Sequence, residues 1–285
     1  MSNQFVEFQN QVEAIKARGA AGEISEAKRD ELIRQLKFKD EWGDTWMLSP
    51  AGEWFRKAKG SDSWIRDYPI NLVDPTNLPP IARMDLHQLA RAVHDCTRCP
   101  LHLTRTRAVP GEGNPEADIM LIGEGPGFHE DKQARPFVGA SGKFLDELLA
   151  GIGYKRADVF IANVVKCRPP GNRDPQAEEL AACQNYLDRQ IELVDPKVIV
   201  TLGRFSMYRY FPGASISKIH GQAQPVGHRL VVPMFHPAAA LHQPRWRPLI
   251  LEDFKKLPQF IAEAAALKPS KNQLDPDNTE QLNLF

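Results

Sequence analysis

The chain has 285 residues, and its 36 Lys and Arg residues equal its 36 Asp and Glu residues, so the formal net charge is zero. A hydrophobic fraction of 42% is enough to build a core and argues against wholesale disorder. No apolar run approaches the roughly 18 residues of a membrane span. The first residues carry neither the basic nor the apolar stretch of a secretory signal. We therefore expect a cytoplasmic protein that has no membrane partner.

Residues 1–75 are expected to form a small N-terminal module of helices and strands. Apolar residues recur at helical spacing from Phe5 to Ile15, and after a glycine-rich break Ser25 is placed to cap a second helix. Four tryptophans follow between Trp42 and Trp64 with glycines among them, which is typical of short paired strands. These aromatic residues indicate either a miniature core or a face that stacks on peptide or nucleic acid.

Residues 85–267 read as one α/β domain, joined to the module by a proline-rich linker at 76–84 and followed by a flexible tail at 268–285. Apolar strands are predicted over 117–123, 159–164, 197–202 and 230–235. Helices are predicted over 86–94, 141–151, 175–193, 204–210 and 247–267, with Asp174 as the cap of the third. This alternation of strands and helices predicts a parallel sheet.

The four cysteines all lie in this domain, with Cys96 and Cys99 as a C-x2-C pair and Cys167 and Cys183 farther along. Structural disulfides are disfavoured because no secretory signal is present. Four thiolates can hold a [4Fe–4S] cluster or a tetrahedral zinc ion, and buried thiols without a ligand are a third interpretation. The wide spacing of the second pair favours the cluster over zinc.

Unusual residues stand where the predicted strands end, which is where the chemistry of such sheets lies. The first strand runs into a glycine-rich loop that carries Glu124 and Glu130, although such loops are often only structural. Phe137 follows beside small residues, and the second strand ends at Asn163, whose amide could read the edge of a planar ring. The last strand ends at His236, for which a turn histidine before a proline is the alternative.

Segments 124–131, 135–142, 163–173 and 236–241, together with the cysteine spacing, resemble the family 4 uracil-DNA glycosylases, the iron–sulfur type. The resemblance covers roughly residues 88–260. It implies a three-layer α/β/α fold with a four-stranded parallel sheet. It also implies a [4Fe–4S] cluster held by the residues that match Cys96, Cys99, Cys167 and Cys183.

The resemblance further implies a monofunctional DNA-repair enzyme that flips uracil out of DNA and hydrolyses its N-glycosidic bond. Phe137 would stack on the uracil ring, and the Asn163 amide would match uracil O4 and N3–H. His236 would hydrogen-bond O2 as negative charge develops on the departing base. The alternative from another class is a non-catalytic iron–sulfur protein that only binds DNA, and a third is a zinc-stabilised nucleotide-binding protein.

One position departs from the wider superfamily, where some members carry an Asp that orients the attacking water. Gly125 occupies that position here, as in family 4, which leaves water activation unassigned. Glu124 and Glu130 are the candidates, with Glu124 slightly favoured, because Glu130 could instead hold the loop or crowd the methyl group of thymine. Leu241 is the candidate wedge that fills the gap left by the flipped nucleotide.

A neutral total charge does not exclude DNA as the partner, because only the field near the site matters. The stretch 196–251 contains no Asp or Glu but seven basic residues. These could form a basic face for phosphates, unless acids from neighbouring segments neutralise them. The residues are Lys197, Arg204, Arg209, Lys218, Arg229, Arg245 and Arg247, together with Lys166, Arg168 and Arg173.

The last five residues resemble the peptide by which bacterial repair and replication proteins dock on the polymerase sliding clamp. A flexible tail would deliver two leucines and a phenylalanine into an apolar pocket while the glutamine sets the register. The third residue is Asn, where Ser or Asp is usual. The expected clamp-binding residues are Gln281, Leu282, Leu284 and Phe285. We expect the protein to be a monomer of bacterial origin.

Overall fold

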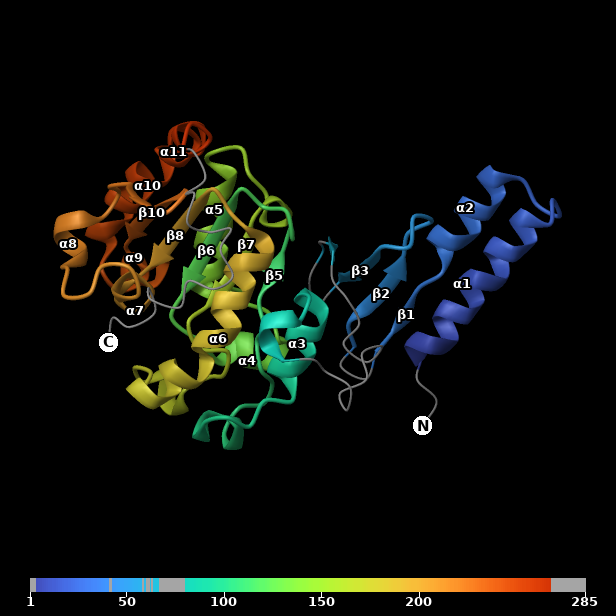
Figure 1. The fold of residues 1–285 in the computed structure, drawn as a ribbon, viewed down its shortest axis with the longest axis horizontal. Helices are drawn as coiled ribbons and strands as arrows, with labels where there is room; N and C mark the ends of the chain where they lie inside the picture. Colours follow the sequence, from blue (N-terminus) through green and yellow to red (C-terminus); the bar gives the residue numbers. More distant parts are fainter. Residues whose placement is uncertain are drawn as a thin grey trace.

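The computed structural model describes residues 4–40, 43–57, 59, 62, 64–66 and 80–267. Two sheets, each with its own apolar core, divide this part of the chain between an N-terminal module and a larger body (Figure 1). None of the described helices is long and apolar enough to cross a membrane.

The N-terminal module packs two helices on an antiparallel sheet of order β1-β2-β3-β4. Ser25 caps the second helix as predicted, since its hydroxyl accepts from the Lys28 N–H. Trp46 and Trp54 are buried against Phe5, so these two tryptophans belong to a miniature core. The elements are α1 (Gln4–Ala20), α2 (Glu26–Gln35), β1 (Phe38–Lys39), β2 (Thr45–Leu48), β3 (Trp54–Lys57) and β4 (Ile65–Arg66).

The body contains a six-stranded sheet of order β5-β7-β6-β8-β10-β9. The four central strands are parallel, as predicted: β6 (Ile119–Gly123), β7 (Phe160–Asn163), β8 (Val198–Leu202) and β10 (Arg229–Met234). The prediction of only four strands is wrong, because antiparallel β5 (Glu112–Gly113) and β9 (Gln224–Val226) extend the two edges. These edge strands are short and contain Gly or Pro, so they give no strand-like pattern.

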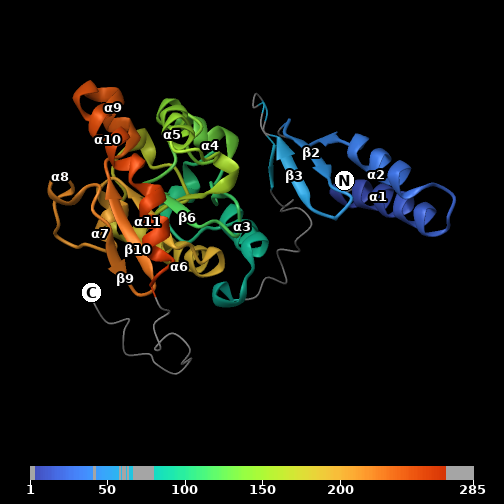
Figure 2. The ribbon, with the colours of Figure 1, turned by 90° about the horizontal axis from the view of Figure 1, so that it is seen from above.

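Helices cover both faces of this sheet, which confirms the expected three-layer α/β/α fold (Figure 2). Alternate residues of a strand point to opposite faces, so Ile119 and Leu121 belong to one apolar cluster and Met120 and Ile122 to another. The first cluster includes residues of α5 (Ala140–Ala150), α10 (Arg247–Lys255) and α11 (Leu257–Ala264). The second includes residues of α6 (Ala177–Val194) and α7 (Arg204–Tyr208).

Several predicted helix boundaries need correction. The third helix begins at Ala177, because Gln176 and Glu179 form a capping box, so Asp174 is not its cap. The predicted closing helix is divided into α10 and α11, since Pro258 cannot donate a backbone hydrogen bond within a continuous helix. The α3 helix (Leu86–His94) lies where predicted. Three short helices are outside the prediction: α4 (Phe128–Gln133), α8 (Ile216–Ile219) and α9 (Pro237–His242).

Candidate active site

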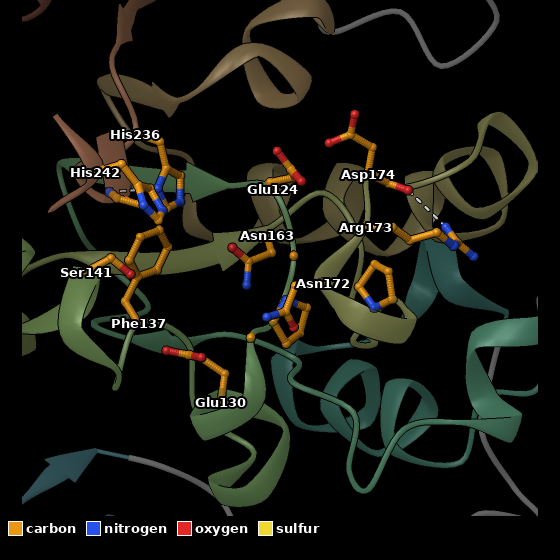
Figure 3. A pocket seen from close by; sticks show the side chains of 15 residues that line it. Glu124, Glu130, Phe137, Ser141, Asn163, Asn172, Arg173, Asp174, His236 and His242 are labelled. Carbon is orange, nitrogen blue, oxygen red and sulfur yellow. Dashed lines mark hydrogen bonds between the residues drawn. The ribbon is translucent and has the colours of Figure 1, made fainter. Parts of the chain in front are cut away.

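A cavity of about 580 Å³ opens where β6, β7 and β10 end (Figure 3). Six of the predicted site residues line it, although they come from segments more than 100 residues apart. The sheet produces this convergence, because parallel neighbours end at the same edge. The predicted residues on the cavity wall are Glu124, Gly125, Glu130, Phe137, Asn163 and His236.

Asn163 presents an unsatisfied polar atom on the cavity wall. It is the last residue of β7, only 2% of it is exposed, and its Oδ1 has no hydrogen-bond partner among the described residues. A buried acceptor without a donor costs about 1–3 kcal/mol, so its persistence points to a donor that a ligand supplies.

Lys166 holds the backbone of this residue. Its Nζ donates to Asn163 O at 2.9 Å and to Gln190 Oε1 at 2.6 Å, and the whole residue is 1% exposed. Burial lowers the pKa of Lys166 to about 7. The prediction that Lys166 belongs to a surface face for phosphates is therefore wrong.

Phe137 and His236 line the same cavity wall as Asn163. Their ring centroids are 5.4 Å apart with an interplanar angle of 24°, so the rings are stacked. Gly123, which ends β6, lets Phe137 and Asn163 approach each other. A Cβ at that position would lie 2.4 Å from Asn163 Oδ1 and 2.7 Å from the Phe137 ring.

The surroundings of His236 fix its protonation state. The Ala238 N–H donates to Nδ1 at 3.1 Å, so Nδ1 is an acceptor and the proton of a neutral ring lies on Nε2. Burial lowers the pKa of His236 to about 4, although the negative charge of Glu130 opposes this shift. At neutral pH the ring is therefore an uncharged donor.

The two candidate carboxylates have different surroundings. Glu130 Oε1 accepts from the backbone N–H groups of Val138 and Gly139, both at 2.8 Å. These hydrogen bonds are the ones expected if Glu130 holds the loop in place. Glu124 lines the cavity, and burial, assisted by the charge of Asp174, raises its pKa.

The backbone at Gly125 is closely packed. A Cβ there would lie 2.8 Å from Val165 Cγ2, so even a small side chain would force a shift in the neighbouring loop. The structure therefore leaves no room at this position for the Asp that other superfamily members carry.

Further residues line the cavity that the sequence interpretation does not assign to it. Asn172, Arg173 and Asp174 follow β7, while Ser141 and His242 lie near Phe137 and His236 (Figure 3). These residues lie within or next to segments 135–142, 163–173 and 236–241, so the sequence resemblance could have indicated them. Asp174 accepts from Arg204 instead of capping α6.

The four cysteines line one smaller cavity between α3, α6 and the segment after β7. Arg105 Nη1 donates to Cys167 Sγ at 2.9 Å, and the Arg98 N–H reaches Cys96 Sγ at 3.5 Å. Among the described residues no group of three or more Cys, His, Asp or Glu side chains forms a site for a metal ion. The shared cavity and the donors to sulfur fit four thiolate ligands of a cluster.

The expected basic face is largely neutralised. Five of its seven residues from 196–251 form ion pairs with Asp or Glu residues of neighbouring segments. This agrees with the alternative interpretation, in which such acids neutralise the basic face. The pairs are Lys197–Asp118, Arg204–Asp174, Arg209–Asp188, Arg229–Asp195 and Arg247–Glu147. Arg173 also pairs with Glu179, at 2.6 Å.

Leu241 lies on α9 outside the cavity wall and is 47% exposed, so it is available to a partner. The expected clamp-binding residues at 281–285 lie outside the described part of the chain, as do residues 76–79 of the expected linker.

Comparison with known proteins gives the following matches. The family described as the Uracil DNA glycosylase superfamily matches residues 110–263, a little over half of the chain. A type-4 uracil-DNA glycosylase of Sulfurisphaera tokodaii is 46% identical over 200 residues, which cover 67% of this chain and 89% of that protein. A type-4 uracil-DNA glycosylase of Archaeoglobus fulgidus is 46% identical over 187 residues, which cover 62% of this chain and 94% of that protein. A type-5 uracil-DNA glycosylase of Thermus thermophilus is 40% identical over 116 residues, which cover 35% of this chain and 52% of that protein.

Proposed function

The chain belongs to the uracil DNA glycosylase superfamily, and from this premise we propose that it removes uracil from DNA. The bond between the base and the deoxyribose is hydrolysed, which leaves an abasic site. The base must first rotate out of the DNA stack to reach a cavity of this kind, at a cost of a few kcal/mol.

The observation that carries the proposal is the single cavity wall shared by Phe137, Asn163 and His236. The uracil ring stacks on Phe137. The unpartnered Oδ1 of Asn163 accepts from uracil N3–H, and its Nδ2 donates to O4. Cytosine carries an acceptor at N3, so it would leave the buried oxygen unsatisfied, and such a mismatch gives strong discrimination.

The remaining chemistry concerns the charge on the leaving base and the attacking water. His236 donates from Nε2 to uracil O2 as the bond breaks, in the uncharged state that its low pKa fixes. Glu124 orients the water or stabilises the cationic sugar. Glu130 keeps the loop at Val138 and Gly139 in place, and Leu241 enters the gap in the DNA.

The proposal includes a [4Fe–4S] cluster with Cys96, Cys99, Cys167 and Cys183 as ligands. The shared cavity of the four thiols supports this assignment, as does the similarity to type-4 relatives. The cluster would supply a structural cross-link between α6 and the segments around it. No step of base removal passes through it.

The organisation of the chain is part of the proposal. We propose an N-terminal module at residues 1–75, a linker at 76–84, a glycosylase domain at 85–267 and a C-terminal tail at 268–285. We assign a monomeric enzyme whose tail docks on a bacterial sliding clamp. Deleting residues 281–285 should abolish binding to a purified clamp without changing activity on a short oligonucleotide.

An oligonucleotide with a single uracil tests the function directly. After incubation with the protein, alkali should cleave the strand at the uracil, and oligonucleotides with cytosine or thymine at that position should remain intact. Retained binding without alkali-labile product would instead identify a non-catalytic DNA-binding protein.

A further inference from the structure

A buried carboxylate outside the cavity, Glu112, organises a cluster of arginines beside the loop that carries Phe137. Its side chain is 2% exposed and accepts from Arg135 Nε at 2.7 Å and from Arg156 Nε at 2.8 Å. Burial alone would raise the pKa of Glu112, but the charges of Arg156 and Arg135 outweigh this and lower it to about 2. The carboxylate is therefore ionised and holds both guanidiniums in fixed positions.

Arg156 extends this cluster to the backbone of the aromatic platform. Its Nη1 donates to Phe137 O at 3.0 Å, and its Nη2 donates to Pro136 O. Phe137 has a φ of +50°, in the left-handed region that a residue with a side chain occupies only when its surroundings enforce it. A Cβ at Gly142 would lie 1.9 Å from Phe137 O, so the carbonyl is confined on that side as well.

The N-terminal module reaches the same carboxylate. Arg56 of β3 places Nη2 3.8 Å from Glu112 Oε2, while its Nη1 donates to Asp44 Oδ2 at 3.1 Å. The side chain of Arg56 is only 10% exposed. Strand β4 of the module lies in contact with the edge strand β5, on which Glu112 stands. The contact therefore joins two parts of the chain that have separate cores.

The charges in this cluster are balanced. Three guanidiniums face three carboxylates. Glu112 pairs with Arg135 and Arg156, Asp44 pairs with Arg56, and Asp146 pairs with Arg156 at 3.2 Å. Removing one partner from a buried set leaves an uncompensated charge, and the remaining groups must then reorient. Loss of Arg56 would pull the two remaining guanidiniums toward Glu112 and disturb the hydrogen bonds that Arg156 makes to the loop.

We propose that Glu112 and Arg156 position Phe137, and that Arg56 makes the N-terminal module part of this arrangement. The proposal rests on the proposed function, in which Phe137 stacks on uracil. The three charged residues act through the backbone of residues 136 and 137, and none of them lines the cavity. They are positioning residues.

Kinetics of the full-length protein on a single-stranded uracil oligonucleotide test this proposal. Arg56→Met should lower kcat/KM about fivefold, as expected for groups coupled in one network. The loss should appear mainly in KM, because a stacking platform binds the base equally before and during bond cleavage. Arg156→Lys should lower kcat/KM at least as much, and the double variant should be no worse than Arg156→Lys alone.

Arg29→Met is the matched control, because Arg29 belongs to the same module but pairs with Glu26 and Asp30. It should retain wild-type kinetics. Tryptophan fluorescence reports whether the module stays folded. Arg56→Met has already removed the guanidinium from Glu112, so the same loss of kcat/KM is required whether or not the module opens. Unchanged kcat/KM in Arg56→Met, or losses that multiply in the double variant, would overturn the proposal. Wild-type protein that does not excise uracil would overturn the proposed function instead.

Discussion

In the proposed function, single residues of this cavity select the base. Asn163 offers a buried oxygen that no described residue satisfies, and in the proposed mechanism a uracil N3–H would supply the missing donor. Leaving such an atom unpaired costs about 1–3 kcal/mol, which corresponds to roughly fivefold to 150-fold discrimination from one contact. His236 adds an uncharged donor because burial keeps its pKa low. We therefore expect base selection and catalysis to depend on different side chains of the same cavity.

The pH dependence of kcat should identify the carboxylate that acts in the reaction. Burial raises the pKa of Glu124 from the ordinary value of 4.5, whereas the pKa of His236 is lowered to about 4. As the pH falls, Glu124 therefore takes up a proton first, and kcat should decline with a midpoint above 4.5 because the reaction needs the ionised carboxylate. Measured kcat from pH 4 to 8 checks this.

In Glu124→Gln, kcat should be lower at every pH. The remaining decline of kcat at acid pH should have its midpoint near pH 4, where His236 is protonated. Glu263 is an exposed carboxylate of α11. The control variant Glu263→Gln should therefore keep the wild-type dependence of kcat on pH. A midpoint that does not move in Glu124→Gln would exclude Glu124 from the role.

At the scale of elements, the strand ends bring the site together. Asn163 ends β7, Gly123 ends β6, and His236 follows β10. The absence of a side chain at Gly123 leaves room for both Asn163 and the Phe137 ring. The sheet edge thus determines which residues meet, and a glycine determines how closely they meet.

Gly123→Ala should damage the site through this close approach. The added methyl group would overlap Asn163 Oδ1 and the Phe137 ring, and overpacking of this kind costs typically about 1–3 kcal/mol. We expect kcat/KM to fall at least tenfold while the far-ultraviolet circular dichroism stays native. Gly151→Ala is the steric control, because its φ is −62° and its Cβ would approach no atom closer than 3.4 Å. Native kinetics in Gly123→Ala would contradict the close packing.

The four central strands were predictable because each is a continuous apolar run. Glu124, Asn163 and His236 stand at or just after the ends of these runs, whereas Glu130 and Phe137 lie farther along and were assigned from their loop and from the resemblance.

Edge strands β5 and β9 were not predictable, since Glu112–Gly113 and Gln224–Val226 carry no periodic apolar signal. The burial of Lys166 was also hidden, because its partners Asn163 O and Gln190 Oε1 become neighbours only in the folded sheet. Sequence spacing likewise cannot show which arginines meet acids from distant segments.

The described part of the chain combines two sheets with their apolar cores, the candidate active-site cavity and a separate cavity lined by the four cysteines. Cys183 lies on α6, Cys96 and Cys99 follow α3, and Cys167 follows β7, so a cluster there would tie these three segments together. Such a cross-link stabilises the folded state, because the unfolded chain does not provide the preformed site.

Cys183→Ser should therefore abolish the iron and the broad visible absorbance of the purified protein. We expect its thermal midpoint to fall by about 10 °C or more, as for loss of a tightly bound ligand. Ala181→Ser, an exposed position in the same helix, should retain both the colour and the midpoint. A colourless wild-type protein with one equivalent of zinc would contradict the cluster assignment.

The most direct test of the whole account is the single-turnover rate of uracil release by Asn163→Ala. The account predicts a rate at least a hundredfold below wild type with the protein folded, because the variant loses both hydrogen bonds to the base. A rate equal to that of the wild type would show that this amide does not recognise uracil.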